Sequence, residues 1–156
     1  MTESDYALLE SQFVALVGDE TDALAIASNF VGLLFNSLDD INWLGIYVLR
    51  KRELVLGPFQ GKPACVRIPV GNGVCGTAAA TLQTQRVADV HAFPGHIVCD
   101  TDSRSEIVVP LIVQDVLLGV LDIDSPSPDR FSEVDQVGIE SLCGVYSELQ
   151  SGKDFI

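Results

Sequence analysis

Basic residues are scarce in this chain of 156 residues. Lysine and arginine total 9 against 22 aspartates and glutamates, which gives a formal net charge of −13 at pH 7. Nucleic acids and anionic membrane surfaces attract proteins through basic patches. The charge balance therefore argues against both kinds of partner.

Long hydrophobic runs and paired cysteines are also missing. No stretch approaches the roughly eighteen apolar residues of a membrane span, and the acidic start Met1–Asp5 lacks the basic and apolar regions of a signal peptide. The sequence thus predicts a cytoplasmic protein. Its four cysteines form no C-x-x-C pair, so in a reducing compartment we expect free thiols, and any disulfide would be transient and catalytic.

Neither an internal repeat nor a linker interrupts the chain, and its length is about that of one domain. Apolar residues make up 47% and charged residues 20%, close to globular averages. We expect residues 1–156 to form a single domain. About 1–40 would be helical, 42–124 would form a sheet with active-site loops, and 132–150 would form a final helix.

Hydrophobic periodicity and turn residues predict the elements. Helices are expected at 6–17, 24–35 and 77–83, with a last helix starting at Ser132, where Ser132 and Asp135 match a capping box. Strands are expected at 42–49, 53–59, 65–70, 86–90, 106–113 and 116–124. Helices first, strands clustered and one helix last indicate an α+β layered domain.

One predicted strand carries a glycine between two aromatic residues on the same face. Trp43, Gly45 and Tyr47 alternate with Leu44, Ile46 and Val48, so the two sets face opposite sides. A gap walled by rings can admit a ligand or another backbone. Ordinary helix–sheet packing is the alternative explanation of the same pattern.

Acidic residues gather on two neighbouring predicted strands. Asp122 and Asp124 are two positions apart, so both carboxylates project from one side of the strand, and Glu106 at the start of the preceding strand could join them. Like charges in one place raise at least one pKa or attract a cation. The three acids would suit an ammonium group or supply a protonated carboxyl as an acid catalyst. A solvated strand end is the alternative.

The predicted loop from His91 to Arg104 is long, and long ordered loops in compact domains are often functional. It carries Cys99, whose pKa His96 and loop amides could lower, whereas the neighbouring acids Asp100 and Asp102 act in the opposite direction. Zinc is a competing use of this region, although no paired-ligand motif supports it. Its ligands would come from Cys65, Cys75, His91, His96 and Cys99.

The segment Gly71-x-Gly-x-x-Gly76 matches a dinucleotide-binding fingerprint by its letters. The preceding stretch contains Arg67 and Pro69, the following predicted helix is short, and no parallel βαβ context surrounds it. We therefore reject a nucleotide-phosphate interpretation and expect a glycine-rich turn that leads into a helix.

Several of these stretches together resemble the free methionine-(R)-sulfoxide reductase family, which uses a GAF-type domain as an enzyme. The resemblance is specific from about Trp43 to Ser125, and the GAF-like order of elements extends it over nearly the whole chain. Its motifs are Cys65-Val-Arg-Ile-Pro, Gly71-x-Gly-Val-Cys75-Gly-Thr, Asp89-Val-His91, Gly95-His96-Ile-x-Cys99-Asp, Ser105-Glu106-Ile-Val and Gly119-Val-Leu-Asp122-Ile-Asp124-Ser.

The resemblance implies a single GAF-like domain with an antiparallel six-stranded sheet and N- and C-terminal helices packed on it. It implies Cys99 as the nucleophile, Cys65 as the resolving thiol and Cys75 as an accessory redox thiol. Substrate binding would fall to Trp43, Tyr47, Ile97, Val98, Glu106, Asp122 and Asp124. We expect Cys143, outside the family's cysteine pattern, to be a buried or interfacial apolar residue.

The implied reaction is reduction of free L-methionine (R)-sulfoxide. A thiolate at Cys99 attacks the substrate sulfur while a neutral carboxyl protonates the leaving oxygen. Cys65 then condenses with the Cys99 sulfenic acid to a disulfide, which thioredoxin reduces. No cofactor is required, and a homodimer is expected. Our hypothesis is that Asp122 binds the amine, while Glu106 and Asp124 donate the proton.

A rival from a different class is a GAF-type module that binds or senses a small molecule without catalysis. GAF folds mostly bind small molecules and regulate attached domains, but this sequence shows no attached output domain. The two readings differ in what happens to the thiols, because only a reductase consumes them.

Overall fold

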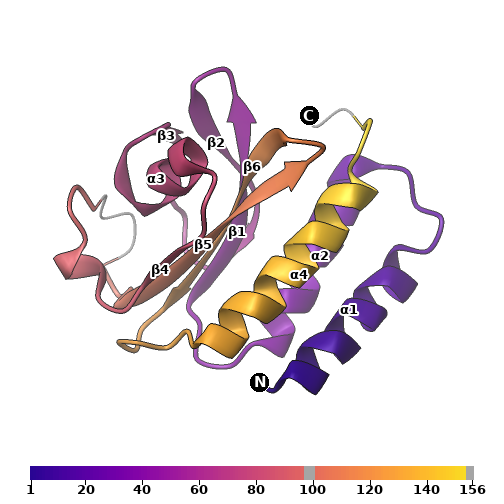
Figure 1. Ribbon diagram of the computed structural model, residues 1–156, viewed down its shortest axis with the longest axis horizontal. Helices are drawn as coiled ribbons and strands as arrows, with labels where there is room; N and C mark the ends of the chain where they lie inside the picture. Colours follow the sequence, from indigo (N-terminus) through magenta and orange to yellow (C-terminus); the bar gives the residue numbers. More distant parts are fainter. Residues whose placement is uncertain (97–100, 154–156) are drawn as a thin grey trace.

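The computed structural model describes residues 1–96 and 101–153, and within them the chain forms a six-stranded sheet with all neighbours antiparallel. The order across the sheet is β3-β2-β1-β6-β5-β4 (Figure 1). The strands are β1 (Trp43–Arg50), β2 (Glu53–Gln60), β3 (Arg67–Pro69), β4 (Gln85–Val87), β5 (Ser105–Val113) and β6 (Val116–Ser125).

Helices cover both faces of the sheet (Figure 1). On one face lie α2 (Ala23–Ser37) and α4 (Glu133–Leu149), and α1 (Glu3–Val17) packs against these two helices as an outer element. On the other face lies α3 (Gly73–Thr81), and a 3₁₀ turn, η1 (Val90–Ala92), follows β4. The predicted α+β class and antiparallel sheet with N- and C-terminal helices are confirmed.

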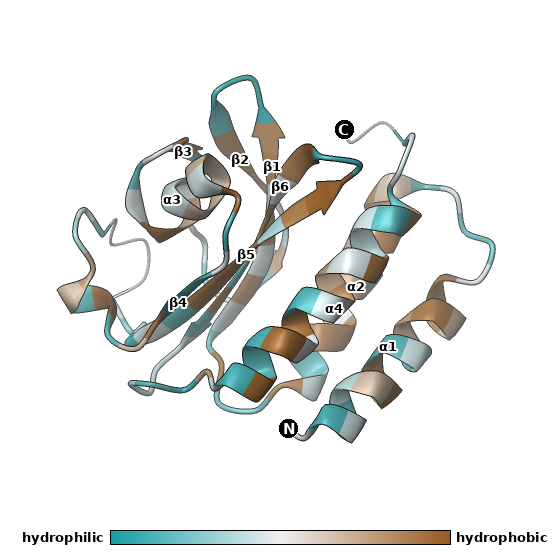
Figure 2. Ribbon diagram, viewed as in Figure 1, coloured by the Kyte–Doolittle hydropathy of each residue, from teal (hydrophilic) through white to brown (hydrophobic). Residues whose placement is uncertain are grey.

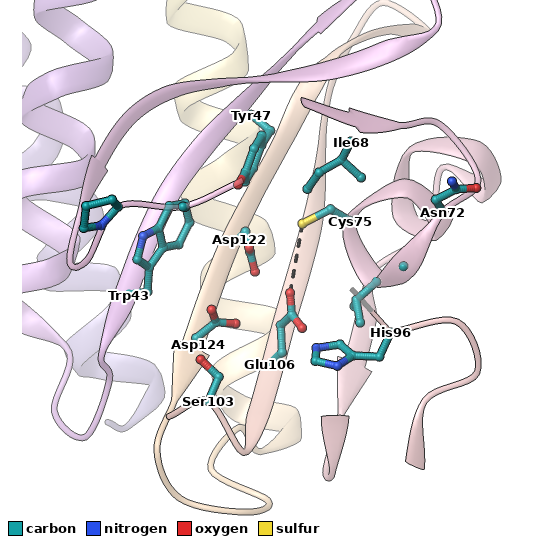
Figure 3. A pocket seen from close by; sticks show the side chains of 14 residues that line it. Trp43, Tyr47, Ile68, Asn72, Cys75, His96, Ser103, Glu106, Asp122 and Asp124 are labelled. Carbon is teal, nitrogen blue, oxygen red and sulfur yellow. Dashed lines mark hydrogen bonds between the residues drawn. The ribbon is translucent and has the colours of Figure 1, made fainter. Parts of the chain in front are cut away.

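The alternation predicted for β1 is confirmed, and it separates two hydrophobic clusters. Leu44, Ile46 and Val48 belong to the cluster beneath α1, α2 and α4. Trp43 and Tyr47 belong to the cluster on the α3 side, where Figure 3 shows them in close-up. Figure 2 shows hydrophobic colour along β5 and β6 and hydrophilic colour in the connections at the sheet ends.

Two of the short predicted strands are shorter than expected. Residues 65 and 66 lie outside β3, although the main-chain N–H of Leu56 still donates to the carbonyl of Val66 over 2.9 Å. Val90 belongs to η1 rather than to β4, because the Asp89 side chain accepts from the N–H of His91 at 3.0 Å and so caps the turn.

Helix α3 begins at Gly73, four residues before the predicted start at Thr77. Gly71 and Gly73 have positive φ angles of 96° and 64°, a region that glycine enters without steric cost. A Cβ at Gly76 would meet the carbonyl oxygen of Pro69 at 2.6 Å. The glycines therefore make a tight turn and bring α3 against β3, which accounts for the motif without a phosphate.

Among the described residues, no helix is both long enough and apolar enough to cross a lipid bilayer. The tight connection predicted between the last two strands is present, since Gln114 and Asp115 both have positive φ angles, 50° and 63°. Two such residues in succession match the geometry of a two-residue hairpin turn.

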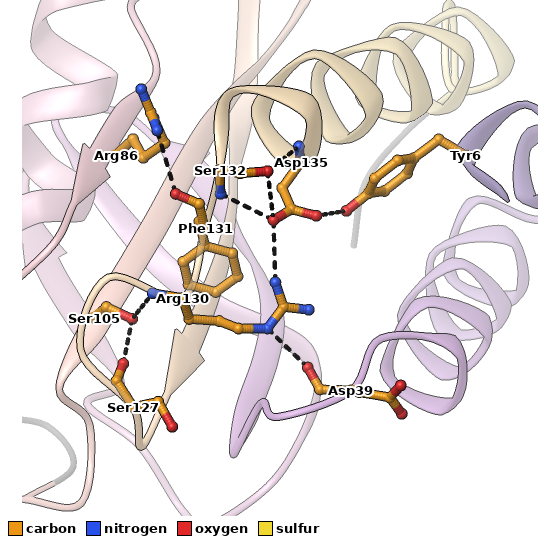
Figure 4. A network of polar contacts seen from close by, with 9 residues as sticks. All are labelled: Tyr6, Asp39, Arg86, Ser105, Ser127, Arg130, Phe131, Ser132 and Asp135. Carbon is orange, nitrogen blue, oxygen red and sulfur yellow. Dashed lines mark hydrogen bonds and ion pairs between the residues drawn. The ribbon is translucent and has the colours of Figure 1, made fainter. Parts of the chain in front are cut away.

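Asp135 joins the helical layers through one buried carboxylate (Figure 4). It accepts hydrogen bonds from the Tyr6 hydroxyl of α1 (2.7 Å) and from the N–H (2.9 Å) and hydroxyl of Ser132, which caps α4. Arg130 pairs with it at 3.1 Å and also donates to the carbonyl of Asp39, which follows α2. The capping box predicted at Ser132 is thus confirmed.

Burial acts to raise the pKa of Asp135, but hydrogen bonds from Ser132 and Tyr6 and the charge of Arg130 more than offset it, so the net pKa is lowered. We expect Asp135→Asn to lower the free energy of unfolding at neutral pH by about 1–3 kcal/mol. Because the folded-state pKa is the lower one, this contribution is complete above the unfolded-state pKa of about 3.9. It is lost as pH falls through the folded-state value.

Urea unfolding of both proteins across this pH range checks the prediction. The exposed Asp19→Asn serves as the matched control and should leave the unfolding free energy unchanged. A stability difference for Asp135→Asn that stayed constant down to acid pH would contradict the role assigned to the carboxylate.

Candidate active site

Three adjacent strands bring the predicted acids and aromatic residues to one face of the sheet. In the register of β1, β6 and β5, Trp43 lies opposite Asp124, and Asp124 lies opposite Glu106. One step of two residues further along, Gly45 pairs with Asp122. Since side chains alternate along a strand, all of these positions face the side that α3 covers.

A pocket opens on this face between the sheet and α3 (Figure 3). It is lined by Trp43, Tyr47, Pro63, Ala64, Ile68, Asn72, Gly73, Val74, Cys75, His96, Ser103, Glu106, Asp122 and Asp124.

The centre of the pocket is a cluster of three buried protonable groups from different elements. Glu106 of β5 and Asp122 of β6 are each 6% exposed, and Cys75 in the first turn of α3 is 5% exposed. The Cys75 thiol donates to Oε1 of Glu106 with a sulfur–oxygen distance of 4.0 Å. The Oδ1 atom of Asp122 is buried and has no hydrogen-bond partner.

Burial is the main influence on the ionisation of this cluster. It raises the pKa of Glu106 well above its usual range, and the neighbouring Asp122 and Asp124 raise it further. The pKa of Asp122 is also raised by burial, although hydrogen bonds from Glu106 and Cys75 act in the opposite direction. Burial and the same acids raise the pKa of Cys75. Glu106 therefore retains its proton to higher pH than an exposed glutamate does.

The aromatic wall differs in one respect from the open gap that the sequence suggested. A Cβ at Gly45 would lie 2.5 Å from the Trp43 ring and 2.5 Å from the Cβ of Phe59. The indole of Trp43 thus fills the space above Gly45, stacked on Tyr47 (centroids 5.9 Å apart) and Phe59 (5.4 Å). The glycine admits the ring of its own neighbour, and that ring forms the pocket wall.

The polar ends of the two aromatic residues anchor the pocket rim. The indole Nε1 of Trp43 donates to the carbonyl of Lys62 at 3.0 Å, and the Tyr47 hydroxyl donates to the carbonyl of Cys65 at 2.8 Å. Both residues are therefore structural supports as well as wall. The segment that carries Cys65 is fixed above them, and Cys65 itself is half-buried.

The other predicted residues have different outcomes. Asp124 is half-buried at the pocket, and Cys75, expected as an accessory thiol, lies at its centre. Cys143 is 2% exposed in the cluster on the opposite face, which confirms the expectation of a buried apolar position. Ile97, Val98 and Cys99 lie outside the described residues.

Sequence reasoning missed part of the pocket. Asn72 precedes α3 as its N-cap residue, and Ser103, 4% exposed, accepts from the Asn42 side chain at 3.2 Å. The dipeptide Asn72-Gly73 signals a turn but not its position beside the acids. Ile68 is the central, buried residue of the three in β3, and its apolar side chain in a predicted strand was a sequence signal for burial. No such signal marked the apolar wall at Pro63, Ala64 and Val74.

In the described part of the chain, Cys75, Glu106 and Asp122 are the group whose ligand atoms have the spacing of a metal site, all within 4.8 Å of one another. This is not the zinc set considered from the sequence, with which it shares only Cys75. The rings of His91 and His96 lie 6.4 Å apart and edge to face, and His96 reaches the pocket wall.

Comparison with known proteins gives consistent matches. The family model for the GAF domain matches residues 3–145. The free methionine-R-sulfoxide reductase of Escherichia coli K12 is 52% identical over 150 residues, which cover 96% of this chain and 91% of the relative.

Two solved structures are similar over most of their length. A putative GAF sensor protein from Burkholderia vietnamiensis has a TM-score of 0.91 at 56% identity and covers 95% of each chain. Free methionine-R-sulfoxide reductase from Neisseria meningitidis, in complex with its substrate, has a TM-score of 0.88 at 42% identity and covers 92% of this chain and 87% of that one. With this identity and coverage, the chain belongs to the free methionine-R-sulfoxide reductase family of GAF-domain proteins.

Proposed function

We propose that this protein reduces free L-methionine (R)-sulfoxide to L-methionine in the cytoplasm. The observation that carries the proposal is the pocket in which buried Glu106 and Asp122 face an aromatic wall while Asp122 Oδ1 has no partner. Support comes from two similar proteins. The Escherichia coli relative is a free methionine-R-sulfoxide reductase, and the Neisseria meningitidis structure shows a free methionine-R-sulfoxide reductase in complex with its own substrate.

The acids account for selection of the free amino acid. An unpartnered buried carboxylate oxygen costs free energy, and a substrate ammonium that donates to Asp122 removes this cost. A methionine residue within a protein has no free amine and would leave the oxygen unpaired. A site built in this way rejects the analogue by several powers of ten. Trp43 and Tyr47 would hold the methyl group and thereby select the R epimer.

The proton for the leaving oxygen would come from Glu106, with Asp124 beside it. Glu106 lies opposite Asp124 in the β5–β6 register, and burial raises the Glu106 pKa, which favours the protonated form that can donate. General acids positioned in this way contribute about 10²–10⁴-fold to a rate.

The thiol steps use Cys99 and Cys65. The Cys99 thiolate attacks the substrate sulfur, the protonated oxygen leaves as water, and a sulfur–sulfur bond joins the two. Water then attacks the Cys99 sulfur, which releases methionine and leaves a sulfenic acid. The Cys65 thiol displaces water from it and forms the disulfide. In sum, one sulfoxide and two thiols give methionine, water and a disulfide.

Recovery of the thiols needs an external dithiol, and we propose thioredoxin as that reductant and a homodimer as the working form. The alternative function is a small-molecule binding module without catalysis. The similarity to the putative GAF sensor protein from Burkholderia vietnamiensis favours this alternative.

The substrate prediction is tested with four compounds: the R and S epimers of methionine sulfoxide, each free and within a peptide. With thioredoxin and its reducing system, only the free R epimer should release methionine, because only it combines the ammonium with the accepted configuration. Failure on all four with thiols confirmed as reduced would favour the binding module instead.

The thiol prediction is tested by counting thiols after exposure to the sulfoxide without reductant. The protein should lose two thiols per chain, and Cys99→Ser should lose none. Cys65→Ser should release about one equivalent of methionine and stop at the sulfenic acid, because its resolving thiol is missing. Cys143→Ala, which removes a thiol from the opposite face, is the control and should still lose two.

The roles of the acids are separated by steady-state kinetics on amide variants. Asp122→Asn should raise KM about 10–100-fold, which corresponds to a lost hydrogen bond to a charged group. Glu106→Gln and Asp124→Asn should mainly lower kcat, by about 10²-fold or more. Asp115→Asn in the exposed β5–β6 turn is the control. If Asp122→Asn lost turnover but kept affinity, the assignment would be wrong.

A further inference from the structure

The pocket contains three potential ligands for a cation that converge from separate elements. Cys75 comes from α3, Glu106 from β5 and Asp122 from β6, and their sulfur and oxygen atoms lie within 4.8 Å of one another. Asp122 is 94% buried, lines the pocket, and its Oδ1 atom has no hydrogen-bond partner. The Asp122 side chain stands between Cys75 and Glu106 in the pocket (Figure 3), and this oxygen is an acceptor left without a partner.

The spacing of these atoms is close to that of a tetrahedral zinc site. Zinc binds thiolate sulfur at about 2.3 Å and carboxylate oxygen at about 2.0–2.2 Å, so two such ligands lie about 3.6 Å apart. The Cys75 sulfur lies 4.0 Å from Oε1 of Glu106. A contraction of about 0.4 Å, within reach of side-chain rotation, would bring this pair to that spacing. The Asp122 oxygen would have to close onto the same point from within 4.8 Å. Three protein ligands and an open side toward the pocket leave the fourth position for water.

The donor set also discriminates among cations. A thiolate favours Zn²⁺ and Cd²⁺ over Mg²⁺ and Ca²⁺, which prefer oxygen ligands in larger numbers. An ammonium gains only a weak hydrogen bond from a neutral thiol at this position, whereas a soft metal that displaces the thiol proton gains a strong bond to sulfur. The cluster is thus built from groups that serve either an amine or a thiophilic metal.

We propose that Cys75, Glu106 and Asp122 form a binding site for a thiophilic divalent cation such as Zn²⁺, whose occupancy excludes substrate from the pocket. The exclusion, though not the metal site itself, rests on the proposed function, because Asp122 would be shared between metal and amine. Zinc bound at this site would then inhibit the enzyme reversibly.

The experiment uses the full chain with Cys65→Ser and Cys99→Ser, so that those two thiols do not contribute. Equilibrium dialysis with Zn²⁺ under a phosphine reductant should give about one metal per chain, and Cd²⁺ should produce the ultraviolet absorption of a cadmium–thiolate bond. Adding Cys75→Ala should abolish the absorption, and adding either Cys75→Ala or Asp122→Asn should weaken Zn²⁺ binding at least tenfold. Adding Cys143→Ala should change neither, and Mg²⁺ should not compete.

Absence of stoichiometric binding, or binding that survives Cys75→Ala, would overturn the site. If Cys75→Ala weakened Zn²⁺ binding but Asp122→Asn did not, the metal would be bound by a single thiol, and the three-residue site would also be overturned. Circular dichroism identifies variants that fail to fold, and the cadmium band of the parent chain tests thiolate ligation without them. Free L-methionine should displace the metal. Metal that binds as predicted but resists methionine would overturn only the exclusion and the shared use of Asp122.

Discussion

The burial of two neighbouring carboxyl groups, away from water, is the constraint on which this site depends. Glu106 and Asp122 come from neighbouring strands and are held on the same face by the antiparallel register of β5 and β6. Neither can leave without disrupting a strand that also supplies the main hydrophobic cluster on its other face. The sheet therefore forces two carboxyls to share a dry environment, and their ionisation adjusts to it.

Burying these carboxyl groups destabilises the folded state, so other interactions in the fold have to offset this cost. The helical side supplies them, because α1, α2 and α4 bury large aromatic and aliphatic side chains such as Phe13, Phe30 and Tyr146. The rings of Phe30 and Tyr146 stack with centroids 4.5 Å apart. The larger hydrophobic cluster thus lies on the helical face of the sheet, whereas the face under α3 combines a smaller cluster with the polar pocket.

Sequence alone was sufficient for those features that depend on local periodicity. The alternation along β1 and the spacing of Asp122 and Asp124 predicted which side chains share a face, and Ser132 with Asp135 predicted the start of α4. Contacts between distant segments were harder. Nothing local indicates that Cys75 meets Glu106 or that Tyr6 reaches Asp135, since both pairs depend on tertiary packing. The early start of α3 was missed because two glycines with positive φ set the turn.

The position of Cys143 shows that the sheet separates the cysteines of this protein. It lies in the cluster under α4, on the face opposite Cys75, and burial raises the pKa of its thiol. Thiol–disulfide exchange requires a thiolate to approach a disulfide sulfur directly, and the strands stand between Cys143 and the pocket. The sheet therefore prevents the Cys143 thiol from exchanging with a disulfide on the pocket side. In the proposed reaction, oxidation is confined to the pocket side of the sheet, and Cys143 is kept from mispairing with the reacting cysteines.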